Sequence, residues 1–159
     1  RVGEKLRGGE RLMALYRFVL GEIAAREASV LHAALEGPSL ASVHREFDLG
    51  EASGVVRLAI YHLLAVEPLV VAPSQLKLFA VGRGDADKDE VVNAVNKQWG
   101  TVLTDDNEAD AVVLAQIART VHQRTRCATR KQAEVVHALL APPSKPHMRK
   151  MRRKSTTNI

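Results

Sequence analysis

The feature that most restricts the fold is the alternation of two short apolar runs with amphipathic helical segments. The runs are 29–35 (SVLHAAL), which ends before Glu36-Gly37-Pro38, and 69–72 (LVVA), which follows Pro68. Neither run alternates apolar with polar residues, which is typical of strands in a sheet that is covered on both faces. Because a helical segment separates the runs, we predict an α/β layer structure in which the two strands pair in parallel.

Helical spacing predicts the remaining elements. Residues 9–27 carry apolar side chains at offsets of three and four, and residues 47–66 return to the same period. Capping residues and breakers predict further helices over 74–79, over 87–99, from Thr104 or Asp105 onward, and from Thr129 to Pro142. Sheets of this class normally have four to six strands, so we expect the first strands of the fold to lie upstream of Arg1.

Composition restricts the class of protein. The 159 residues are 46% hydrophobic and 26% charged, which fits one globular domain. No apolar run approaches the roughly 18 residues that a membrane helix needs. The single cysteine, Cys127, has no partner for an internal disulfide. We therefore expect a cytoplasmic protein without a membrane partner.

The positive charge is concentrated at the carboxyl terminus. The formal net charge is +5, yet six basic residues and no acids lie in 145–159. We therefore divide the chain into a domain over 1–141 and a basic, flexible tail over 142–159. Such a tail favours a polyanionic partner, although a solvated tail with no role is the alternative.

Glu36 is the first candidate for chemistry. It stands at the carboxyl end of a predicted buried strand, directly before Gly-Pro. Ligands and catalytic groups collect at this end of α/β sheets, and a divalent cation would neutralise a partly desolvated carboxylate there. The alternative is a solvated residue at the start of a loop.

A second acidic group lies at the start of the predicted helix that follows Thr104. Asp105, Asp106, Glu108 and Asp110 fall within six residues. Capping preferences alone enrich acids at a helix start. However, Asp106 and Asp110 share the face that continues into the apolar stripe, and Asn107 lies three residues before Asp110. Together with Glu36, these oxygen ligands could hold one or two Mg²⁺ or Mn²⁺ ions.

Four segments of the sequence, in order, resemble the RuvC Holliday-junction resolvases of bacteria and phages. They are Glu36-Gly37-Pro38-Ser39, the helix entry 48–54 (DLGEASG), the stretch from Val71-Ala72-Pro73 through 77–88 (KLFAVGRGDADK), and 105–111 (DDNEADA). The resemblance covers about residues 9–122. It implies an RNase H-like fold with a mixed sheet flanked by helices, a homodimer, and Mg²⁺-dependent nicking of four-way DNA junctions.

The resemblance also implies roles for single residues. Glu36 matches the family's strand-end glutamate, and Asp110 matches its last metal-binding aspartate. The position three before Asp110 is usually Asp or His in the family, whereas it is Asn107 here, so Asp106 is the natural substitute. The first-strand aspartate of the family has no counterpart, because no Asp precedes Asp48.

Candidate DNA-binding residues lie near the candidate metal-binding positions in sequence. Lys77, Arg83 and Lys88 surround a Gly82-x-Gly84 loop and could contact phosphates, although a lone GxG is more often a flexible turn. The segment 39–47 (SLASVHREF) contains Leu40 and Arg45 and resembles the family's junction-opening loop. Phe47 could wedge between bases, but we predict an apolar staple at the head of the following helix.

Three functions remain open from the sequence. The first is a two-metal endonuclease that resolves branched DNA, with Glu36, Asp106 and Asp110 as catalytic residues. The second is a non-catalytic nucleic-acid-binding module of the same fold. The third is a related enzyme that acts on RNA–DNA hybrids.

Overall fold

Two parallel strands and six helices make up the part of the protein that the computed structural model describes, residues 6–26, 32–37 and 46–141. In chain order the elements are α1 (Gly8–Ala24), β1 (Ala34–Glu36), α2 (Glu46–Leu64), β2 (Leu69–Val71), α3 (Pro73–Val81), α4 (Lys88–Trp99), α5 (Asp106–Gln123) and α6 (Arg130–Leu140). In the sheet, Ala34 lies opposite Leu69 and Glu36 lies opposite Val71. The predicted parallel pairing is therefore confirmed.

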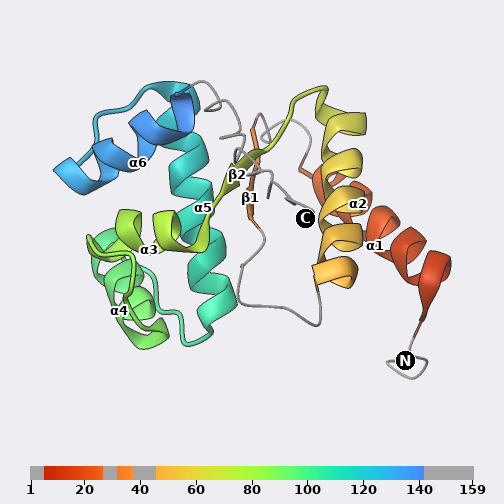
Figure 1. Ribbon diagram of the computed structural model, residues 1–159, viewed down its shortest axis with the longest axis horizontal. Helices are drawn as coiled ribbons and strands as arrows, with labels where there is room; N and C mark the ends of the chain where they lie inside the picture. The colour runs from red at the N-terminus through yellow and green to blue at the C-terminus, as the bar shows by residue number, and fades with distance from the viewer. Residues whose placement is uncertain (1–5, 27–31, 38–45, 142–159) are drawn as a thin grey trace, which may run out of the picture.

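The helices form two groups with the sheet between them. Figure 1 shows α1 and α2 on one side of the two strands and α3 to α6 on the other. Helix α2 connects β1 to β2, as a crossover between parallel strands requires. Helix α3 follows β2 after a single residue, so the carboxyl end of β2 leads directly into the second group.

Glycine 37 allows a close approach of the chain to β2 directly after Glu36. The Gly37 amide donates a hydrogen bond of 2.7 Å to the Val71 carbonyl oxygen, which extends the ladder by one step. A Cβ atom at Gly37 would lie 3.2 Å from Cγ1 of Val70 and 3.4 Å from the Val71 oxygen. The glycine at position 37 therefore follows from packing, and its hydrogen bond fixes the backbone next to Glu36.

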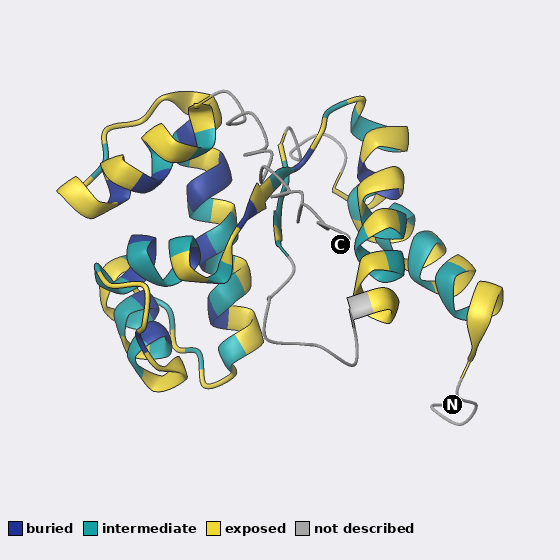
Figure 2. Ribbon diagram, viewed as in Figure 1, coloured by how far each residue is buried: buried dark blue, intermediate teal, exposed yellow. Residues whose placement is uncertain are grey.

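The hydrophobic core lies on the α3–α6 side of the sheet. Its buried members include Val71 of β2, Leu76 of α3, Val95 of α4, Ile117 of α5 and Val135 of α6. Figure 2 shows the buried residues concentrated in these four helices. Burying apolar area there supplies the main driving force for the fold and holds α5 in a fixed position beside β1.

The α1–α2 pair is less deeply buried. No residue of α1 is buried, and the predicted apolar face of this helix is only half-buried. Large apolar side chains remain exposed on both helices, among them Phe18 of α1 and Leu58 and Tyr61 of α2. An apolar surface of this kind commonly marks a contact site for another protein surface.

The helix boundaries agree with the sequence predictions to within three residues, but the boundaries of the first strand do not. We predicted a strand over 29–35, whereas β1 spans Ala34–Glu36 and residues 29–31 lie outside the described residues. Glu36 is thus the last residue of the strand. The predicted staple is wrong, because Phe47 is 78% exposed and lies within α2.

Two predictions about the chain as a whole have different outcomes. Among the described residues, no helix is both long and apolar enough to cross a lipid bilayer. The proposed boundary at residue 141 stays a prediction, since the basic tail over 142–159 lies outside the described residues.

Candidate active site

Two carboxylates from distant parts of the sequence meet at the carboxyl end of the sheet. Glu36 ends β1, and Asp110 lies in the second turn of α5, which packs beside β1. Burial raises the pKa of Glu36, and the negative charge of Asp110 raises this pKa further. The two groups are therefore close enough to interact, as the sequence predicted for Glu36 and Asp110.

The pKa of the Asp110 carboxyl group is raised as well. Partial burial is the main cause that raises the pKa of its carboxyl group, and the charge of Asp106 adds to the effect. Lys77 and Lys88 oppose the shift by lowering this pKa. The net direction is upward for both Glu36 and Asp110, and partial burial, which disfavours the charged form, is the main cause in each case.

The turn before α5 is built to present Asp110 toward the sheet. Gly100 ends α4 with a φ of 68°, a left-handed conformation that suits glycine. The Asn96 side chain then secures the next residues: its Oδ1 accepts from the Leu103 amide (2.8 Å) and from Thr101 Oγ1 (2.9 Å), and its Nδ2 donates to the Leu103 oxygen (2.9 Å). These bonds fix where α5 begins.

The first acid of the 105–110 cluster has a structural role. Asp105 is the N-cap of α5, and its Oδ1 accepts from the Asn107 amide at 2.8 Å and the Glu108 amide at 3.0 Å. The capping explanation is therefore correct for Asp105. Asn107 is exposed in the first turn of the helix.

Asp106 is paired with a cation. Lys88, the first residue of α4, donates a hydrogen bond to Oδ2 of Asp106. This bond is the largest cause that lowers the pKa of Asp106, in contrast to the raised pKa of Asp110. The two predicted metal ligands Asp106 and Asp110 thus differ, because a bond from Lys88 stabilises the charged form of Asp106, whereas partial burial disfavours the charged form of Asp110.

Among the predicted metal ligands, Asp110 interacts electrostatically with Glu36 and with Asp106. Within 6–26, 32–37 and 46–141, no group of three or more His, Cys, Asp or Glu side chains has an arrangement that could hold a metal ion. Mg²⁺ is usually bound through one or two carboxylates, with water and substrate phosphates completing the octahedron. The donor set of Glu36 and Asp110, both with raised pKa values, fits one hard divalent cation.

The predicted DNA-binding cations have unequal surroundings. Lys77 of α3 lies near both carboxylates, since it lowers the pKa values of Glu36 and Asp110. Arg83 is instead paired with Glu90, and at 3.4 Å with Asp85. Because Lys88 is also paired, Lys77 is the predicted cation that acts on both acids and has no ion pair among the described residues. Leu40 and Arg45 lie outside the described residues.

Sequence reasoning missed one contributor to this site. Asn96 was not singled out, although it secures the turn before α5. A signal for Asn96 existed, because an Asn four residues before a helix-ending Gly is well placed to bond to the turn that follows.

The comparisons with known proteins concern the fold. No family model matches the sequence. A structure of RuvC from Thermus thermophilus matches with a TM-score of 0.60 and 20% identity, covering 87% of this chain and 72% of that one. A structure of T. thermophilus RuvC in complex with a Holliday junction substrate matches with a TM-score of 0.61 and 23% identity, covering 72% and 70%. The chain therefore has a RuvC-like, RNase H-like fold, of which the described residues contain a two-stranded parallel sheet.

Proposed function

We propose that this protein is a metal-dependent endonuclease that cleaves branched DNA such as four-way junctions. The observation that carries the proposal is the pairing of Glu36 and Asp110 at the carboxyl end of a RuvC-like sheet. One of the similar structures holds a Holliday junction substrate. Two partly buried carboxylates can bind a hard cation, and a phosphodiester oxygen can then bind to that cation.

Each residue of the site has a part in the proposal. A bound Mg²⁺ or Mn²⁺ would stabilise the negative charge that develops on the phosphate and lower the pKa of a water nucleophile. Glu36 and Asp110 would hold the cation, because the core keeps α5 packed beside β1. Lys77 would contact a phosphate oxygen of the strand to be cut, which places the phosphodiester over the two acids.

Asp106 and Asn107 would extend the ligand set. Asp106 is only 31% exposed at its side chain and is held by Lys88. A DNA phosphate competes with Asp106 for the Lys88 ammonium group, because both are anionic acceptors. In the DNA complex, Asp106 would then be released to act as the third carboxylate, with the Asn107 side chain as a further oxygen donor.

The exposed apolar surface supports a homodimer. Met13 and Phe18 of α1 are 49% and 64% exposed, and Leu58 and Tyr61 of α2 are 59% and 53% exposed. Cutting two opposed strands of a junction requires two active sites related by a two-fold axis. We propose that the α1–α2 pair supplies the contact between the two copies.

A second candidate function is a nucleic-acid-binding module without nuclease activity. The observation that favours it is the lack of a three-ligand group among the described residues. Cleavage of RNA–DNA hybrids is the further alternative within the same fold. One panel of substrates separates all three.

The experiment compares end-labelled DNA substrates with and without Mg²⁺: a four-way junction, a linear duplex of the same sequence, and an RNA–DNA hybrid. We expect Mg²⁺-dependent cuts in the junction and few cuts in the duplex. The Glu36→Gln variant should still bind the junction in a gel-shift titration but should no longer cut it. Preferred cutting of the hybrid would support the third function. Junction binding without cleavage by the unmodified protein would support the binding module.

A further inference from the structure

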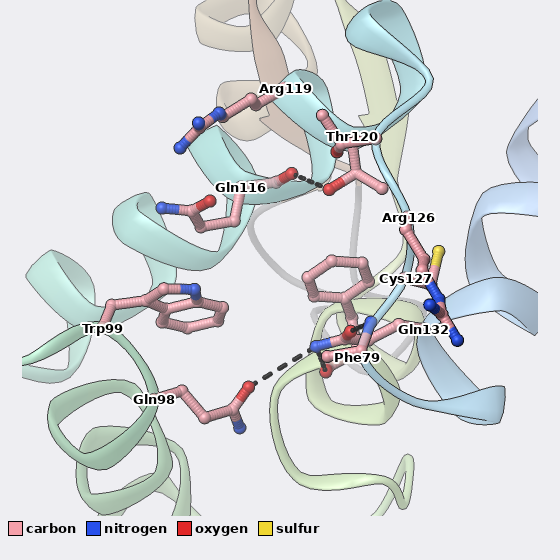
Figure 3. Close-up of a pocket in the computed structure, with 11 residues that line it drawn as sticks. Phe79, Gln98, Trp99, Gln116, Arg119, Thr120, Arg126, Cys127 and Gln132 are labelled. Atoms are coloured by element: carbon pink, nitrogen blue, oxygen red, sulfur yellow. Dashed lines mark hydrogen bonds between the residues drawn. The ribbon is translucent and has the colours of Figure 1, made fainter.

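A pocket of about 280 Å³ lies on the other flank of α5 from the acid pair. Its walls come from α3, α4, α5, α6 and the connection between α5 and α6 (Figure 3). Gln116 and Thr120 of α5 line it, six and ten residues beyond Asp110. At 100° per residue they lie roughly 80–120° around the helix from Asp110. The pocket is therefore separate from the proposed nuclease site.

The floor of the pocket is fixed by a buried glutamine. Gln132 of α6 is 5% exposed, and its Oε1 accepts from the Ala128 amide at 2.9 Å. Its Nε2 donates to the Phe79 oxygen and to Gln98 Oε1, both at 3.4 Å, and Gln98 donates to the Ala80 oxygen at 2.6 Å. Figure 3 shows the bonds from Gln132 to Phe79 and to Gln98, which join the lower walls. The side-chain amides of Gln98 and Gln132 are thus occupied, and the site is preformed.

The upper walls carry polar groups that have no partner in the described residues. The side-chain amide of Gln116 makes no hydrogen bond there, nor does the guanidinium group of Arg126. Arg119 makes one bond within its own helix, from Nε to Gln123 at 3.3 Å, so both of its terminal nitrogens remain available. The indole ring of Trp99 forms the wall on the α4 side (Figure 3).

The charge of the pocket has one sign. Two arginines line it, and none of its lining residues is an aspartate or a glutamate. Elsewhere on the described surface, basic side chains such as Arg57, Arg83 and Lys88 have acidic partners. A pocket with unpaired guanidinium groups selects an anion, and guanidinium groups bind phosphate oxygens with two parallel hydrogen bonds.

We propose that this pocket binds a single nucleotide unit, a planar heterocyclic base with its phosphate. The base would stack on the indole of Trp99, where aromatic side chains commonly receive unpaired bases. The amide of Gln116 would donate to and accept from the edge of the base, and Arg126 and Arg119 would bind the phosphate. The volume is near the lower end of the range for ligand sites, about 300–1,000 Å³, which suits one such unit.

The nucleotide could be free in solution or could be an unpaired nucleotide of a DNA strand, and the chemistry of recognition is the same. The proposal does not depend on the proposed nuclease activity, because none of its residues belongs to the acid pair. Its test therefore uses protein without divalent metal and measures binding only.

The experiment uses the fluorescence of Trp99, which is the only tryptophan of the chain. The intact protein is titrated in EDTA with deoxymononucleotides, with a duplex that carries one bulged nucleotide, and with the same duplex fully paired. Excitation at the long-wavelength edge of the indole band avoids absorption by the bases. We expect saturable quenching, because a base stacked on the ring changes its excited state. Quenching by mononucleotides indicates a free nucleotide as the ligand, and quenching by the bulged duplex alone indicates a strand nucleotide.

Variants test whether the ligand binds in this pocket. Arg126→Gln should weaken binding about tenfold, the usual effect of losing a charge-assisted hydrogen bond, and Gln116→Leu should weaken it less. Arg124→Gln is the matched control, since it makes the same change two residues away at an exposed position outside the pocket. Equal midpoints in the unmodified protein, Arg126→Gln and Gln116→Leu would overturn the proposal. An unquenched Trp99 with all three ligands would overturn it as well.

Discussion

Replacing Asp110 by asparagine should stabilise the metal-free protein. The substitution keeps the shape of the side chain and removes a negative charge that partial burial and Asp106 both disfavour. It also removes the charge that raises the pKa of Glu36. Most single substitutions destabilise a protein, so an increase in stability at this position would be a specific signature of the acid pair.

The magnitude is small because solvent screens the charges. Both carboxyl groups remain partly exposed, and Lys77 and Lys88 offset part of the repulsion. We therefore expect the free energy of unfolding to rise by about 0.5 kcal/mol at neutral pH, the scale of partly screened pairs. For a domain of this size, the corresponding increase in Tm is about 1–2 °C.

The sign of the pH dependence follows from the raised pKa of Asp110. Above this pKa the folded protein carries the disfavoured charge, so the unmodified protein is penalised relative to Asp110→Asn. As the pH falls through the raised pKa, the carboxyl group becomes neutral and the penalty is lost. The difference in stability between the two proteins should therefore shrink in acid.

Thermal denaturation followed by circular dichroism, in EDTA and over a pH series, measures the effect. Glu108→Gln is the matched control, because Glu108 lies exposed in the first turn of α5, where a negative charge favours the helix. Its Tm should stay level or fall. A lower Tm for Asp110→Asn than for the unmodified protein at neutral pH would refute the reasoning. A difference in Tm between the two proteins that grows in acid would refute it as well.

Three further predictions concern other parts of the account. Lys88→Met removes the donor that lowers the pKa of Asp106, so an NMR titration should show a higher pKa for this carboxyl group in the variant; an unchanged value would contradict the ion pair. Leu58→Glu places a charge on the exposed apolar face, so sedimentation should show a monomeric variant and a dimeric unmodified protein. If the variant is also a dimer, that face does not form the contact. Deleting residues 143–159 should flatten the salt dependence of junction binding, with the log–log slope changing by about 0.9 per lost phosphate contact; superimposable isotherms would show that the tail makes none.

Much of the fold could be predicted from the sequence because its signals are local. The N-caps Asp87, Asp105 and Thr129 and the helix-ending Gly100 lie where capping chemistry and periodicity place them. The strand at 29–35 was misplaced because an apolar run of seven residues does not show which part of it pairs. Pairing depends on β2, and of the described residues 32–37 the strand that pairs with it is Ala34–Glu36.

The site was predictable in part for the same reason. Glu36 and Asp110 could be found because each stands at the end of an element where a sheet edge collects ligands. The difference between Asp106 and Asp110 could not be found, since it depends on Lys88, which is 18 residues away in sequence. The pocket beside Trp99 was also hidden, because four helices and a connecting segment contribute to it.

The central claim is that Glu36 and Asp110 together hold a divalent cation. The most direct measurement is a titration of Mn²⁺ with the protein, followed by the electron paramagnetic resonance signal of the free ion. The account predicts that the unmodified protein and Glu108→Gln deplete this signal with the same affinity, whereas Glu36→Gln and Asp110→Asn deplete it far less. Equal depletion by all four proteins would contradict the claim, as would a free-ion signal that the unmodified protein leaves unchanged.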